Sequence, residues 1–234
     1  MLAIVLSVVL LGVAAPSHAA TPLDDLPVVE HLVPPTDATA EDRLFVVLFS
    51  GDGGWSTLTR ELTAALNAAG YSVVGWNTLK YFWHAKTPEQ AAADLDRVIR
   101  FYADRLNADR VILTGYSMGA DVLPAMANRL SASALADVHS VVLLAPGRAT
   151  AFEFHFSGWL NRVPQGAQPI KPDVVRLLEH TRVVCVYGED EANTSLCTEL
   201  GDTKASRIEL PGAHHFDGNY AQLAELILHG KTVT

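Results

Sequence analysis

The amino-acid sequence predicts an α/β fold in which a mainly parallel sheet is covered by helices on both faces. Short apolar runs alternate along the chain with segments of helical spacing, and this alternation is typical of parallel strands joined by helical crossovers. The runs are apolar throughout rather than at every second position, as expected for strands buried on both faces. The 234 residues, 49% of them hydrophobic, are enough for one domain with a full core.

The chain is acidic, with 17 Lys and Arg against 26 Asp and Glu and a formal charge of −9. No basic run interrupts this balance, which disfavours binding of nucleic acid or of anionic lipid through the general field of the protein. Contact with a membrane is therefore expected only through a lipid substrate that is recognised locally. The nine histidines lack ligand spacing such as H-E-x-x-H, so we expect neither a metal nor a cofactor.

Residues 1–19 are expected to form a signal peptide. Residues 1–15 are almost wholly apolar and too short for a transmembrane helix, and Ser17 and Ala19 are small residues at the −3 and −1 positions of a cleavage site. No Lys or Arg precedes the apolar core, and an uncleaved anchor is the alternative. The signal peptide predicts export.

The rest of the chain divides into an extended lead-in, 20–42, and one domain, 43–234. Four prolines fall in the lead-in and disfavour a helix there, although residues 28–33 could add an edge strand. The strands expected in the domain are 44–49, 71–76, 110–116, 138–145, 182–187 and 206–210. The expected helices are 56–69, 87–106, 118–130, 172–180 and 217–229.

Two irregular, aromatic segments interrupt the alternation. Residues 77–86 contain Tyr81 and Trp83, and we expect both side chains to contribute to substrate binding. Residues 148–171 contain four aromatic residues, and their position and composition predict a cap over the site.

One stretch of the sequence predicts a catalytic serine. A run of β-branched residues and leucine, 111–114, ends in GYSMG at 115–119, and helix-forming residues follow at once. G-x-S-x-G at a strand-to-helix turn is the nucleophile elbow of the α/β-hydrolase fold. A Cβ at Gly115 or Gly119 would collide with neighbouring backbone in so tight a turn. The strand before and the helix after make a chance match less plausible, and Ser117 is therefore the candidate nucleophile.

A serine hydroxyl needs a base to take its proton and an acid to orient that base. In α/β-hydrolases the chain order is Ser, acid and His, and the acid here should follow the strand 182–187. Asp190 and Glu191 both stand there. Glu191 is preferred because the acid of this fold usually stands three residues after the glycine, and Asp190 stays open.

The candidate base follows the last strand, where His214 and His215 are adjacent. The usual pattern of the fold is a loop of small residues, then His, then an aromatic residue. Because Phe216 follows His215, we prefer His215 to His214. A solvated loop is the alternative explanation of paired histidines, and the position after the last strand disfavours it.

The oxyanion formed during acyl transfer needs two donors. One is expected to be the backbone N–H of Met118, and the other should come from the glycine-rich loop after strand 44–49, at Asp52 or Gly53. A phosphate-binding loop is excluded because its Lys and Ser/Thr are missing. Asp121 stands four residues after Ser117, on the same helix face. Together with Asp52 it could form an acidic wall for a cationic substrate group; alternatively, it satisfies local backbone or pairs with an Arg.

The two cysteines, Cys185 and Cys197, bracket the acid loop. In an exported protein two cysteines favour a disulfide, which would close a short loop and hold the acid in place. The alternative is a buried thiol on the strand and a second free thiol.

Several motifs taken together resemble the bacterial virulence protein family VirJ/AcvB. They are FSGDGGW at 49–55, YFW at 81–83 with TPE at 87–89, GYSMGADVLP at 115–124, YGEDE at 187–191 and GAHHFD at 212–217. The resemblance spans essentially the whole mature chain and implies a periplasmic serine hydrolase of the α/β-hydrolase fold. Members of the family are tied to hydrolysis of aminoacylated phosphatidylglycerol, notably the lysyl form, and to type IV secretion. The resemblance supports Ser117 and His215 and leaves the acid open.

Two classes of function remain. The first is an esterase that cleaves an acyl or aminoacyl ester through an acyl-enzyme, with a general lipid or thioester hydrolase as the variant within this class. The second is a non-catalytic periplasmic partner of a type IV secretion apparatus. A complete Ser–acid–His set favours the esterase, because a scaffold needs none of the three residues.

Overall fold

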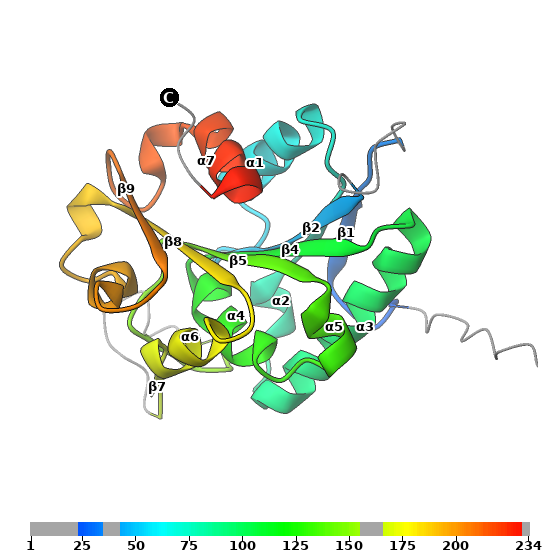
Figure 1. The fold of residues 1–234 in the computed structure, drawn as a ribbon, viewed down its shortest axis with the longest axis horizontal. Coiled ribbons are helices and arrows are strands. Elements are labelled where there is room, and N and C mark those ends of the chain that lie inside the picture. Colours follow the sequence, from blue (N-terminus) through cyan, green and yellow to red (C-terminus); the bar gives the residue numbers. More distant parts are fainter. Residues whose placement is uncertain (1–22, 35–42, 155–165, 231–234) are drawn as a thin grey trace, which may run out of the picture.

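The computed structural model of the protein describes residues 23–34, 43–154 and 166–230. At its centre lies a sheet of seven strands in the order β1-β3-β2-β4-β5-β8-β9 (Figure 1). The strands are β1 (Val28–His31), β2 (Leu44–Phe49), β3 (Val73–Trp76), β4 (Arg110–Tyr116), β5 (Val138–Leu144), β8 (Arg182–Gly188) and β9 (Ser206–Leu210). Neighbouring strands pair in parallel, except that β1 pairs antiparallel with β3 at the edge. The predicted mainly parallel sheet is confirmed, and residues 28–31 do form an edge strand.

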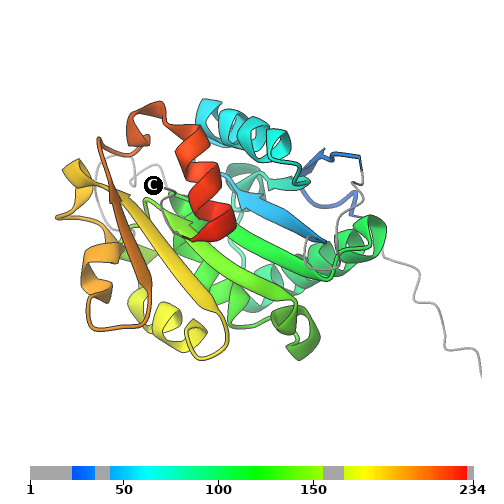
Figure 2. The ribbon, with the colours of Figure 1, turned by 45° about the horizontal axis from the view of Figure 1, so that its top comes forward.

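Helices cover both faces of the sheet. On one face α1 (Thr57–Ala68) and α7 (Tyr220–His229) lie side by side (Figures 1 and 2). The helices on the other face are α2 (Thr78–Tyr81), α3 (Pro88–Leu106), α4 (Met118–Ala127), α5 (Ala132–Ala136) and α6 (Lys171–Leu177). The long helix α3 starts at a reciprocal capping box, in which the Thr87 hydroxyl accepts from the Gln90 N–H and the Gln90 side chain accepts from the Thr87 N–H.

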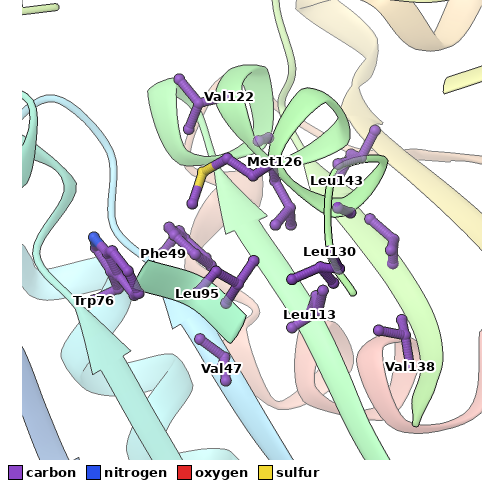
Figure 3. Close-up of a cluster of buried hydrophobic side chains, with 14 of the residues drawn as sticks. Val47, Phe49, Trp76, Leu95, Leu113, Val122, Met126, Leu130, Val138 and Leu143 are labelled. Atoms are coloured by element: carbon purple, nitrogen blue, oxygen red, sulfur yellow. The ribbon is translucent and has the colours of Figure 1, made fainter. Parts of the chain in front are cut away.

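Two hydrophobic cores sandwich the sheet. Alternate residues of β2 enter different cores: Val47 and Phe49 pack beneath α3 and α4, whereas Val46 and Leu48 pack beneath α1 and α7. Figure 3 shows the first core, with Phe49 and Trp76 beside Leu95 and Met126. Because both faces are covered, every position of the strand is buried from residue 45 on, which explains why the strand appears in the sequence as a continuous apolar run.

Some local elements differ from the expectations. The segment 77–86, predicted to be irregular, contains the four-residue helix α2, and the short helix α5 was not predicted. The last helix begins at Tyr220 rather than at 217, because the Asn219 side chain caps it by accepting from the Gln222 N–H. Residues 216–218 form a separate 3-10 turn, η5 (Phe216–Gly218).

The predicted cap, 148–171, is described only at its two ends. There β6 (Ala149–Thr150) pairs antiparallel with β7 (Gln168–Pro169), and residues 155–165 lie outside the described residues, as does the expected signal peptide, 1–19. Within the described part of the chain, no helix is both long and apolar enough to cross a bilayer.

The predicted disulfide is confirmed. Cys185 on β8 is bonded to Cys197 on the 3-10 segment η4 (Leu196–Leu200), and both residues are fully buried. The bond closes the loop that carries Glu191, so it ties the candidate acid to the sheet.

Opening this disulfide is expected to lower the free energy of unfolding by about 2–4 kcal/mol, because the unfolded chain regains the entropy that a short closed loop removes. Urea unfolding in the presence and absence of a reductant measures the effect. A Cys185→Ala/Cys197→Ala variant is the matched control, since it should have the lower stability in both buffers. Two free thiols in non-reduced, alkylated native protein would show that the bond is absent.

Candidate active site

Ser117 occupies the turn between β4 and α4 with a strained backbone. Its φ of 53° and ψ of −122° lie where a residue with a Cβ is rarely found. The turn is fixed on both sides: the Ser117 N–H donates to the carbonyl of Leu144 on β5 (2.9 Å), and the Ser117 carbonyl accepts from the Asp121 N–H (3.0 Å). The half-buried serine is therefore held at the carboxyl edge of the sheet, as the nucleophile-elbow motif predicts.

The two glycines of the elbow permit this turn for the steric reason inferred from the sequence. A Cβ on Gly115 would clash with the carbonyl of Gly119. A Cβ on Gly119 would lie 2.6 Å from the carbonyl oxygen of Ser50 and 2.7 Å from the Cβ of Phe49. The start of α4 thus packs directly against the end of β2, and this contact brings the loop after β2 to the nucleophile.

The acid loop and the histidine loop touch at a third glycine. A Cβ on Gly188, at the end of β8, would lie 2.5 Å from the carbonyl oxygen of Ala213. The Asp190 N–H also donates to the Gly212 carbonyl (3.2 Å). The two loops that follow β8 and β9 are therefore in direct contact, which places the acids opposite the histidines.

Glu191 bonds a histidine across this contact. The His214 Nδ1 lies 2.9 Å from Oε1 and 3.0 Å from Oε2 of Glu191. A carboxylate only accepts, so Nδ1 carries the proton of this hydrogen bond, which leaves Nε2 as the nitrogen that can act as a base. Asp190 is exposed. Among the described residues, Glu191 is the acid whose side chain forms a hydrogen bond with one of the two histidines. The geometry thus agrees with the preference for Glu191.

The preference for His215 is corrected by this geometry. Phe216 is buried beneath α7, in the core that contains Val46 and Leu48. Its neighbour His215 is exposed, whereas His214 is partly buried, with 37% of its side chain accessible. The aromatic residue used as a marker for the base therefore anchors the loop, and the histidine two positions before it, rather than the adjacent one, reaches the acid.

Tyr116, the residue before Ser117, contacts the histidine loop. Its hydroxyl donates to the His214 carbonyl (3.3 Å), and its ring lies 5.2 Å from the His214 ring between centroids. Burial raises the pKa of Tyr116, and the negative charges of Glu191 and then Asp52 raise it further. The tyrosine before the nucleophile therefore lies between the acid loop and the loop after β2. From the sequence, Tyr116 was not singled out, and His214 was named only as the alternative to His215.

The loop after β2 also approaches the nucleophile. A Cβ on Gly51 would lie 3.3 Å from the Cβ of Ser117, so the chain passes Ser117 at Gly51 and reaches Asp52 one residue later. The first N–H bonded within α4 is that of Asp121, to Ser117, and the N–H of Met118 therefore has no carbonyl partner inside the helix. Met118 and the loop 51–53 are thus placed where oxyanion donors are expected.

Asp121 satisfies local backbone, one of the two alternatives drawn from the sequence. Its Oδ1 accepts from the Gly147 N–H at 2.8 Å. Although solvent reaches part of the residue, burial raises the pKa of the Asp121 carboxyl to about 7; the Gly147 bond lowers it, and the charge of Asp52 raises it. The acidic wall of Asp52 and Asp121 stays a prediction.

The two aromatic residues expected to bind substrate have different environments. Tyr81 is buried, its hydroxyl donates to Asp94 (2.6 Å), and its ring packs on Trp76. The structure therefore places Tyr81 in the core rather than on the surface of the site. Trp83, in contrast, is 52% exposed.

Among the described residues, no cluster of three His, Cys, Asp or Glu side chains could hold a metal ion. A groove of about 520 Å³ lies beside β1, lined by residues such as Leu23, Phe101 and Arg105. None of its lining residues belongs to the elbow, the acid loop or the histidine loop.

The family of the protein follows from comparison with a family model. The model described as bacterial virulence protein (VirJ) matches residues 42–233. The chain belongs to the VirJ family. The match confirms the resemblance inferred from the motifs, and in this VirJ-family chain it contains the elbow, the acid loop and the histidine loop.

Three solved structures that resemble this VirJ-family chain are hydrolases by their descriptions. Est1E from Butyrivibrio proteoclasticus, with ferulic acid bound, has a TM-score of 0.57 at 13% identity, over 88% of this chain and 94% of that one. A monoacylglycerol lipase from Paleococcus ferrophilus has a TM-score of 0.52 at 16% identity, over 88% of this chain and 99% of the lipase. A lidless α/β serine hydrolase from Xanthomonas campestris has a TM-score of 0.53 at 18% identity, over 87% of this chain and 86% of that hydrolase. These similarities show the α/β-hydrolase fold. A comparison with curated proteins finds no match.

Proposed function

We propose that the protein is a serine hydrolase that cleaves an ester through an acyl-enzyme. The main support is the Glu191–His214 hydrogen bond, made at the same edge of the sheet as the strained Ser117. A structural role needs neither a strained serine at the elbow nor an oriented histidine beside it. The description of related folds as esterases and lipases agrees with this reaction class.

In the proposed reaction, the Ser117 hydroxyl attacks the carbonyl carbon of the ester while Nε2 of His214 takes its proton. The negative charge on the carbonyl oxygen is stabilised by the N–H of Met118 and by an N–H of the loop at Asp52 or Gly53. The C–O bond then breaks, and the leaving alcohol takes the proton from His214. Water, activated by the same histidine, releases the acid and restores Ser117.

We further propose that the substrate carries an ammonium group, as the lysyl ester of phosphatidylglycerol does. Asp52 follows Gly51 in the loop that passes Ser117, and Asp121 lies in the first turn of α4 after Ser117. In the proposed site, their negative charges would oppose the anionic intermediate unless a cation matches them. An ammonium beside Asp121 would gain a charge-assisted hydrogen bond worth about 1.5–3 kcal/mol. The resemblance to aminoacyl-phosphatidylglycerol hydrolases points to the same substrate class.

This substrate preference should depend on pH in a defined direction. The pKa of Asp121 is raised to about 7, so its carboxyl is mainly neutral at pH 6 and mainly ionised at pH 8. A lysine ammonium remains charged over this range. The ratio of kcat/KM for a lysyl ester to that for a norleucyl ester should therefore rise between pH 6 and pH 8. Both substrates carry the same α-amino group, so the ratio isolates the side-chain charge.

The variant Asp121→Asn should lower this ratio about tenfold or more at pH 8 and remove its pH dependence, with little change in the norleucyl rate. Asp104→Asn is the matched control, since it removes one negative charge from an exposed position on α3. Equal losses on both esters would show that Asp121 acts only on the Gly147 backbone. Turnover of neither ester, with intact fold, would favour a non-catalytic role beside type IV secretion components.

Export to the periplasm remains part of the proposal. A disulfide between Cys185 and Cys197 persists in an oxidising compartment. Fractionation of cells that produce the full chain, with a cytoplasmic and a periplasmic marker, tests it directly.

A further inference from the structure

Two stacked aromatic rings lie on the segments that follow β3 and β5. The rings of Trp83 and Phe154 stack at 5.7 Å between centroids, with an interplanar angle of 11°. Trp83 is 52% exposed, more than any other large hydrophobic residue among those described. We call this pair the aromatic platform.

The platform is fixed to the core. Two backbone hydrogen bonds join its two segments: the Phe154 N–H donates to the Phe82 carbonyl (2.7 Å), and the Lys86 N–H donates to the Phe152 carbonyl (2.9 Å). Beneath it the ring of Phe82, fully buried, meets the ring of Phe152 edge-on at 5.6 Å. These contacts fix the position of the exposed Trp83 side chain.

The platform lies at the edge of the sheet that carries Ser117. Its segments follow β3 and β5, and the carboxyl ends of β2 and β4 lie between them. The first segment also contacts the loop after β2, since the Thr78 N–H donates to the Ser50 hydroxyl (3.0 Å). A surface that binds the platform therefore faces the loops that surround the nucleophile.

The charge near the platform differs from that of the whole protein. Residues 77–87 include Lys80, His84 and Lys86 and no acid, in a chain with a formal charge of −9. The second segment adds one acid, Glu153. Lys80 is exposed, so a cationic group stands three residues before Trp83 in the same segment.

We propose that the aromatic platform docks the protein on the surface of an anionic lipid bilayer. Tryptophan is favoured at the boundary between head groups and acyl chains because its ring is apolar and its N–H is polar. Lysines close to such a surface are attracted by anionic head groups. Docking here holds the carboxyl edge of the sheet against the head groups, where an ester on a lipid can reach Ser117. The inference rests on the proposed function and specifies how the lipid substrate is approached.

Vesicle binding tests the proposal in the full chain with Ser117→Ala, so that no lipid is consumed. Sedimentation with mixed phosphatidylglycerol and phosphatidylcholine vesicles should show binding that is weaker on phosphatidylcholine alone. Adding Trp83→Ala should lower the partition coefficient about tenfold, because the exposed half of the tryptophan side chain is no longer transferred from water to the bilayer. Lys80→Gln should lower it about fivefold on the anionic vesicles. Val175→Ala, which truncates a 43% exposed side chain on α6, is the matched control and should bind like its parent.

Fluorescence locates the contact. Brominated acyl chains should quench part of the tryptophan emission, and Trp83→Phe, which keeps an aromatic ring, should retain most of the binding but lose that quenching. No vesicle binding, equal binding of Trp83→Ala and its parent, or an equal loss in Val175→Ala would overturn the proposal.

Kinetics separate this inference from the proposed function. With Ser117 present, Trp83→Ala should reduce turnover of lysyl ester in vesicles far more than turnover of a water-soluble lysyl ester. Equal losses would mean that the rings bind the substrate rather than the bilayer, and the docking proposal would fail while the hydrolase proposal stands. Absence of ester turnover in the unmodified chain would instead count against the proposed function.

Discussion

Replacing Ser117 with alanine is expected to reduce ester hydrolysis by about a thousandfold or more, because the nucleophile and its base act as a unit. The fold should be retained, since the change removes only the hydroxyl of a half-buried side chain at the tip of the elbow. Initial rates on a lysyl ester and thermal unfolding measure the two effects separately. Ser133→Ala, which removes an exposed hydroxyl on α5, is the control and should leave both unchanged. A Ser117→Ala variant that retains most of the rate would exclude the acyl-enzyme.

The two histidines should respond very differently to the same change. His214→Ala is expected to lower kcat by about a thousandfold or more, because it removes the base that Glu191 orients. His215→Ala should cost less than about tenfold, since His215 is exposed and Glu191 bonds its neighbour. The adjacent variants control for each other, because both shorten a histidine in the same loop. If His215→Ala lost the rate and His214→Ala kept it, the choice of base made from the structure would be wrong.

The fold could be predicted because its physical cause is local in the sequence. Residues 45–49 are buried on both faces of β2, and such a strand has to be apolar at every position. The elbow was recognisable for a similar reason, because the close contacts of Gly115 and Gly119 leave no room for a Cβ. In both cases the sequence itself records a steric or solvation requirement.

The choice between His214 and His215 could not be made in this way. It depends on Phe216 turning into the core beneath α7, and on the contact between Gly188 and Ala213 that brings the acid loop alongside. Both are contacts between segments distant in the chain or between a loop and the core. A motif of a histidine followed by an aromatic residue contains neither.

Tyr81 and Asp121 show the same limit for substrate contacts. Tyr81 lies two residues before the exposed Trp83 in the sequence, yet its hydroxyl donates to Asp94 on α3. The raised pKa of Asp121 arises from enclosure beside Gly147 in the loop after β5. Neither the partner nor the enclosure can be inferred from the residues next to them in the chain.

Labelling with a fluorophosphonate probe, followed by intact-mass measurement and peptide mapping, tests the central claim that Ser117 is an activated nucleophile. The probe reports chemistry at the serine and needs no knowledge of the substrate. We predict one adduct per chain, located on Ser117, formed rapidly in the unmodified protein, much more slowly in His214→Ala and not at all in Ser117→Ala. An unlabelled native protein, or equal labelling of the unmodified and Ser117→Ala chains, would contradict it.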